Sequence, residues 1–103
     1  MTGEQLLGML GALASAHRLR ILAVLQANGR TYVSQLARDI GISRPLVHLH
    51  LQKLEAAGLV TSKLELSADG KALNYFEVSN FEVLLTPTVI AQAAASLPDV
   101  EPN

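Results

Sequence analysis

The side chains best suited to chemistry lie together in the segment 43–57. Arg44 can donate two parallel hydrogen bonds to the edge of a guanine. Leu49 can contact the methyl group of thymine, and the free N–H groups at a helix start attract phosphate. This chemistry predicts contact with DNA. The expected contact residues are Ser43, Arg44, Pro45, His48, Leu49, Gln52 and Lys53.

Two of these side chains keep alternative roles open. Arg44 contacts either a base or a phosphate, because phosphate and sugar receive half or more of the hydrogen bonds between proteins and DNA. His48 either contacts DNA or is an exposed histidine without a ligand. For the neighbouring His50 we expect a structural role, packed at the edge of its helix.

The sequence gives little indication of a catalytic site or a metal site. Cysteine is absent, and three histidines occur in 103 residues. His48 and His50 are two positions apart, so on a helix they point about 200° apart and cannot hold one metal ion. The sequence has no Gly-x-Ser-x-Gly or His-Glu-x-x-His motif and no glycine-rich phosphate loop. We therefore predict no enzyme, no metal site and no cofactor.

The elements that must position these residues form a pair of helices with a tight turn. A helix is predicted over 34–40 with Ser34 as its N-cap, followed by a turn at Gly41, where a positive φ is expected. The second helix is predicted over 43–57, with Ser43 as its N-cap. These dimensions are typical of a helix-turn-helix.

Apolar residues anchor this pair on one side. Leu36 and the small Ala37 are expected to face the second helix, and Val47, Leu51 and Leu54 recur at i, i+4 and i+7. This spacing leaves the polar side chains of the second helix on or near the opposite face.

The segment resembles the helix-turn-helix of the ArsR-type winged-helix repressors. The pattern runs from Leu36 to Val60 as Leu-Ala-x-x-x-Gly-Ile-Ser-x-x-x-Val-x-x-His-Leu-x-x-Leu-x-x-Ala-Gly-Leu-Val, and 14–22 resembles the opening of the same family. The resemblance implies a homodimer that places helix 43–57 in the major groove of a pseudo-palindromic operator. It also implies a hairpin wing at 60–78 that touches the DNA backbone, with Lys63 and Lys71 as candidates.

The family's dimers are held by their first and last helices. Here 6–13 and 81–97 are apolar on several sides, which is typical of a helix that buries a second face against a partner. The expected interface residues are Leu6, Leu7, Leu10, Leu13, Leu84, Leu85 and Val89. The cysteine pairs and the histidine sites of the family's metal sensors are missing from this sequence.

The remaining pattern predicts a mainly α-helical chain with a small β-hairpin, that is, a winged helix-turn-helix of about five helices. Further helices are expected over 2–14, 15–27 and 81–97, with Pro87 in the first turn of the last helix or at a kink in it. A short strand is expected at 31–33, and strands 59–66 and 72–78 flank an Asp-Gly turn. We predict one domain over 1–97 and a tail at 98–103.

Charge is unevenly distributed along the chain. The formal net charge is −1, but residues 17–63 carry seven Lys and Arg against two Asp and Glu. The interpretation is a basic centre within acidic flanks, which suits a polyanionic partner. Arg18, Arg20 and Arg38 are expected on the wet faces of their helices, where they either grip phosphate or are simply solvated.

Three further expectations concern location, effector and partner. The apolar stretch 6–16 lacks a preceding Lys or Arg and is too short to span a bilayer, so we interpret it as a buried helix and predict a cytoplasmic protein that binds no membrane. A small-molecule or protein effector is left open, as no polar cluster points to one. The competing hypothesis is a winged-helix module that binds protein and not DNA, since fold alone does not decide function.

Overall fold

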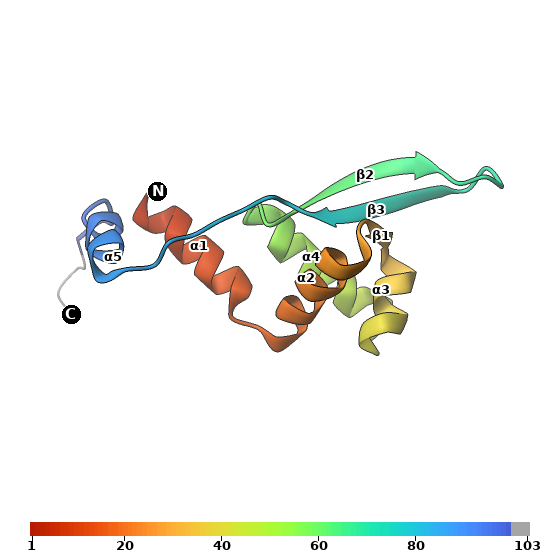
Figure 1. Cartoon of the computed structure of the whole chain (residues 1–103), viewed down its shortest axis with the longest axis horizontal. Coiled ribbons are helices and arrows are strands. Elements are labelled where there is room, and N and C mark those ends of the chain that lie inside the picture. The colour runs from red at the N-terminus through yellow and green to blue at the C-terminus, as the bar shows by residue number, and fades with distance from the viewer. Residues whose placement is uncertain (100–103) are drawn as a thin grey trace.

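The computed structural model describes residues 1–99 and confirms a mainly α-helical winged helix-turn-helix with a β-hairpin (Figure 1). The elements run in the order α1 (Gly3–Leu13), α2 (Ala16–Asn28), β1 (Thr31–Tyr32), α3 (Val33–Ile40), α4 (Arg44–Ala56), β2 (Val60–Leu66), β3 (Ala72–Val78) and α5 (Pro87–Ala94). Residues 100–103 of the predicted tail lie outside the described residues.

The helix starts follow capping residues that the sequence displays. The side chain of Thr2 accepts a hydrogen bond from the backbone of Gln5, whose side chain accepts one from Thr2, which completes a capping box for α1. Ser15 and Ser43 cap α2 and α4 through their side-chain oxygens. Gly41 has φ of 80° at the end of α3, so the predicted left-handed turn is confirmed.

The core lies where α2, α3 and α4 meet the base of the sheet. Ile21, Leu36, Val47 and Leu54 are fully buried there, and the core residues of α4 follow the predicted i, i+4, i+7 spacing. Phe76 of β3 closes the core from the sheet side. The buried set is aliphatic apart from this one aromatic ring, so its stability depends on close packing of branched side chains.

The sheet is antiparallel, with the strand order β1-β3-β2. β2 pairs with β3 over its whole length, from Val60 opposite Val78 to Leu66 opposite Ala72, whereas β1 contributes two residues. The chain turns from β1 directly into α3, so Tyr32 takes the N-cap position, and its side chain accepts no capping hydrogen bond. The prediction of Ser34 as the N-cap of α3 was therefore wrong.

The predicted helix 81–97 was wrong in its first half. Helix α5 starts at Pro87, and residues 79–86 form an extended connection without helix or strand. Thr86 has φ of −136° and ψ of 160°, because the residue before a proline avoids the helical region. Its hydroxyl caps the helix by accepting a hydrogen bond from Val89 N at 3.1 Å. Pro87 thus occupies the first turn, where it has no N–H to satisfy.

The molecule is elongated, with extents of 57 × 29 × 20 Å. Its radius of gyration is 16.5 Å, whereas a compact domain of this length has about 13 Å. The tip of the β2–β3 hairpin and α5 lie at opposite ends, and α5 packs beside the N-terminal part of α1 (Figure 1). Within residues 1–99, no single helix is long and apolar enough to cross a membrane; α1 and α2 reach that length only together, across a bend of 87°.

Candidate nucleic-acid interface

Helix α4 divides cleanly into a buried face and an exposed face. Val47, Leu51 and Leu54 have at most 1% of their surface exposed. Leu49 is 47% exposed although it lies in the same helix. All seven predicted contact residues are exposed: Ser43, Arg44, Pro45, His48, Leu49, Gln52 and Lys53.

The start of α4 lies beside the hairpin. Arg44 and His48 line a hollow of about 230 Å³ together with residues 32–34 and with Ala72 and Asn74 of β3. The free N–H groups of the first turn of α4 belong to the same end of the helix. This arrangement places donors from two elements on one surface, which is the geometry needed to follow a groove and its flanking phosphates.

Lys53 lies on a different flank of α4. It lines a second hollow with Arg18 and with Gly8 and Gly11 of α1. The structure thus brings Arg44 and His48 together but does not bring Lys53 to them.

The hairpin carries both predicted lysines in exposed positions. Lys63 has its Nζ atom 3.7 Å from an oxygen of Glu65, which offsets part of its charge. Lys71 follows the turn, where its backbone N–H donates to the hydroxyl of Ser67 at 3.1 Å. The carboxylate of Asp69 in this turn accepts a hydrogen bond from the hydroxyl of Ser67, which lowers the pKa of Asp69.

The distribution of free positive charge differs from the one that the sequence predicts. Arg30 donates to both carboxylate oxygens of Glu65, one at 2.6 Å, and its guanidinium lies 4.4 Å from the centre of the Tyr75 ring. Arg18 is also unavailable, being 9% exposed. The prediction that Arg18 stays on the wet face of α2 was therefore wrong. Arg18 and Arg30 are engaged within the chain, and Lys63 is partly so through Glu65.

Comparison with known proteins decides the family. A family model described as winged helix-turn-helix DNA-binding matches residues 15–61, from the cap of α2 to the first residues of β2. An uncharacterized HTH-type transcriptional regulator of Methanocaldococcus jannaschii is 33% identical over 79 residues, which cover 77% of this chain and 81% of the relative. This chain belongs to the winged helix-turn-helix transcriptional regulators. It is a DNA-binding regulator and not an enzyme.

Solved structures agree with this assignment. The homodimeric winged helix-turn-helix DNA-binding domain of a possible ArsR-family regulator from Mycobacterium bovis matches 89% of this chain and 73% of its own, with a TM-score of 0.65 and 26% identity. NolR from Sinorhizobium fredii matches 89% of this chain and 80% of its own, with a TM-score of 0.61 and 29% identity.

The regulator exposes large apolar side chains in its terminal arm, which we define as α1, residues 79–86 and α5. Leu7, Leu84, Leu85 and Ile90 are 48–71% exposed in this arm. Of the predicted interface residues, Leu10 is also exposed, Leu13 and Val89 are half-buried, and Leu6 is buried within its own chain.

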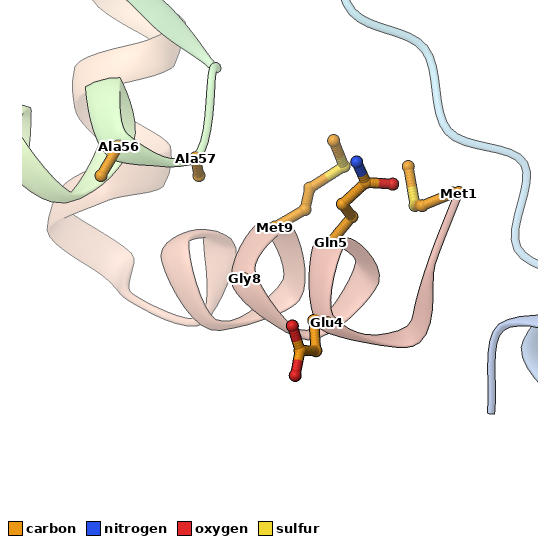
Figure 2. A pocket seen from close by; sticks show the side chains of 7 residues that line it. All are labelled: Met1, Glu4, Gln5, Gly8, Met9, Ala56 and Ala57. Atoms are coloured by element: carbon orange, nitrogen blue, oxygen red, sulfur yellow. The ribbon is translucent and has the colours of Figure 1, made fainter. Parts of the chain in front are cut away.

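A groove between α1 and the end of α4 continues this apolar surface. It encloses about 650 Å³ and is lined by Met1, Met9, Ala56 and Ala57, among others. Figure 2 shows the methionines on the side of α1 that faces the alanines, whereas Glu4 points away. The groove shares Gly8, Ala56 and Ala57 with the hollow that Lys53 lines.

Sequence reasoning missed two features of the regulator's surface. Leu64 and Leu66 are 68% and 76% exposed near the tip of the hairpin, on the sheet face that Phe76 shares. The alternation of residues along the strand could have placed both leucines on one face. It could not show that the hairpin extends beyond the core, because that depends on tertiary structure. The burial of Arg18 against His50 likewise has no signal in local sequence, because the two residues are 32 positions apart.

Proposed function

We propose that this regulator binds as a homodimer to a pseudo-palindromic operator, with α4 of each protomer in the major groove and the β2–β3 hairpin on the backbone. The observation that carries the proposal is the exposed surface of α4, which presents Arg44 and His48 beside the hairpin and leaves Leu49 and Gln52 exposed on the same helix. Guanidinium and amide groups on a helix of this kind read base edges, and the hairpin lysines neutralise phosphates.

The dimer is supported by the terminal arm. A single chain leaves large leucines of the arm exposed, and such a patch is typical of an association surface. The Mycobacterium bovis domain, which matches this chain through most of its length, is homodimeric. A two-fold axis through the arm would set two copies of α4 about 34 Å apart, one turn of DNA.

Selection of bound sequences from random DNA tests this proposal. We expect two inverted half-sites whose centres are about 10 base pairs apart. Measured between low and moderate salt, the logarithm of affinity should fall with a slope of about −0.9 for each phosphate contact. A selected pool without inverted symmetry, or an affinity insensitive to salt, contradicts the proposal.

Single substitutions then separate base contacts from phosphate contacts. Arg44→Ala should relax the preference at one position of each half-site, a change of about 1–3 kcal/mol if Arg44 reads a base. Lys71→Ala should weaken binding to all sequences alike. Arg20→Ala, which removes an exposed cation from α2, serves as the matched control and should change neither property by as much. Equal effects of Arg44→Ala on all sequences would assign Arg44 to a phosphate.

A further inference from the structure

Arg18 joins three helices through one buried guanidinium. Its Nε donates to the carbonyl of Ala12 at 2.6 Å, and its Nη2 donates to the carbonyl of Gly11 at 3.3 Å. Its Nη1 lies 3.1 Å from Nδ1 of His50 in α4. The two carbonyls belong to the last turn of α1, where a cation is favoured by the helix dipole. The carbonyl of Gly11 also accepts a hydrogen bond from the backbone N–H of Ala14 at 3.3 Å.

The contact between Arg18 and His50 defines the protonation state of the imidazole. A guanidinium can donate hydrogen bonds but cannot accept them. Nδ1 of His50 must therefore accept, which requires a neutral ring with its proton on Nε2. A second proton on His50 would remove the acceptor and place two cations in contact.

The surroundings of His50 oppose that second proton. His17 and Arg18 face it from α2, with the two imidazole ring centres 5.5 Å apart, and Lys53 approaches from its own helix. From α1 the nearest partners of the cluster are the carbonyls that Arg18 binds. Burial, followed by the charges of Arg18, His17 and Lys53, lowers the pKa of His50.

We propose that Arg18 is a positioning residue for DNA recognition, which holds α4 at a fixed place against the C-terminal end of α1 through neutral His50. This inference rests on the proposed function, in which α4 reads DNA and α1 belongs to the dimer arm. The guanidinium of Arg18 links α4, the proposed recognition helix, to α1, which belongs to the proposed dimer arm. A shift at this link changes the spacing of the two reading helices in the dimer and so the fit to both half-sites.

The contact between Arg18 and His50 should make operator binding depend on pH. Because the pKa of His50 in the folded state lies below its ordinary value of about 6.5, the unfolded state takes up the proton first as the pH falls. The contribution of His50 to stability is complete above the ordinary pKa and is lost as the pH falls through the folded-state pKa. Operator affinity should weaken over the same range.

Two substitutions at His50 test the proposal. His50→Asn keeps a neutral oxygen acceptor for Arg18 but removes the titration, so binding to the selected duplex should stay close to that of the wild type at pH 7.5. As the pH is lowered from 7.5, the wild type should lose affinity beyond any loss of His50→Asn, and this extra loss should set in below pH 6.5 and grow as the pH falls further. Both proteins retain His17 and His48, so the difference between them isolates His50.

His50→Leu removes the acceptor and leaves Nη1 of Arg18 without its partner. We expect about ten-fold weaker binding to the selected duplex at pH 7.5 and a smaller change for an unselected duplex of equal length. Circular dichroism melts ensure that binding is compared well below each unfolding midpoint. A folded His50→Leu protein that binds the selected duplex as tightly as the wild type, or a His50→Asn protein with the wild-type pH dependence, overturns the proposal.

A readout without DNA separates this inference from the proposed function. Nitrogen chemical shifts of the free wild-type protein at pH 7.5 should show His50 with unprotonated Nδ1 and protonated Nε2. The opposite tautomer overturns the role of Arg18. A wild-type protein that shows this tautomer but does not prefer the selected over the unselected duplex contradicts the proposed function, and with it positioning by Arg18.

Discussion

The helix-turn-helix core and the terminal arm of this regulator differ in how far their apolar side chains are buried. In the core, formed by α2, α3, α4 and the base of the sheet, Ile21, Leu36 and Val47 have no exposed surface. In the arm, Leu84 is 71% exposed and Leu7 is 59% exposed. Both regions are rich in leucine and alanine, so composition does not explain the difference.

The difference lies in what each region packs against. The core closes on itself, because three helices and the sheet cover one another's apolar faces. Helix α5 packs on α1 and is tied to the core by the extended segment 79–86. One chain therefore suffices to fold the core, whereas the arm leaves large leucines exposed, as surfaces that associate with a partner do.

The largest expected effect is the loss of a core side chain. Leu51→Ala should lower the free energy of unfolding by about 2–5 kcal/mol, because it leaves a cavity among side chains that cannot collapse around it. Leu49→Ala, in the same helix but on the exposed face, should change the free energy of unfolding by no more than about 0.5 kcal/mol. Urea denaturation of both variants measures the contrast, and similar losses would mean that α4 is not divided into two faces.

A smaller effect on folding but a strong effect on association is expected from Leu84→Glu. Two-fold symmetry places the carboxylate in the proposed dimer interface twice, and burying it without a partner should raise the dimer dissociation constant about a hundred-fold or more. Sedimentation equilibrium measures this constant. Leu66→Glu, at a similarly exposed leucine of the hairpin, is the control. If both variants dimerise like the wild type, the arm is not the interface.

Apart from the N-cap of α3 and the burial of Arg18, the core could be predicted because its signals are local. Ser15 and Ser43 cap helices at the places where the sequence has a cap, and Gly41 takes the left-handed conformation that ends α3. The change to a two-residue apolar spacing after α4 likewise predicts the hairpin. These features depend on neighbours within a few residues, which a sequence displays directly.

The rest depended on contacts between distant residues. Apolar content at 81–86 suggested a helix, but the restriction that Pro87 places on Thr86 decided the start of α5. Arg30 is paired with Glu65, 35 residues away, and the hydrogen bond lowers the pKa of Glu65. Counting charge by segment therefore overstated the free positive charge, since no local pattern shows which cations are already engaged.

The smallest expected effect concerns how firmly α5 is held by its own chain. A Cβ atom at Gly3 would lie 2.5 Å from the carbonyl oxygen of Ala93 and 2.5 Å from the side chain of Leu97, so Gly3→Ala must push α5 away from α1. A Cβ at Gly8 of the same helix meets nothing within 4 Å. Both changes are best made in the Leu84→Glu background, which we expect to be monomeric.

In that background, Gly3→Ala should cost about 1–3 kcal/mol of α5 docking, because the tight contact cannot be relieved without moving backbone. Gly8→Ala should stabilise α1 by about 0.5–1 kcal/mol, since alanine loses less conformational entropy than glycine in a helix. Hydrogen exchange of the amides of Ile90 and Ala91 measures α5, and the melting midpoint measures the core. Faster exchange in α5 with an unchanged midpoint would show that the arm opens independently of the core. Unchanged exchange in Gly3→Ala would instead mean that α5 is not held by this contact.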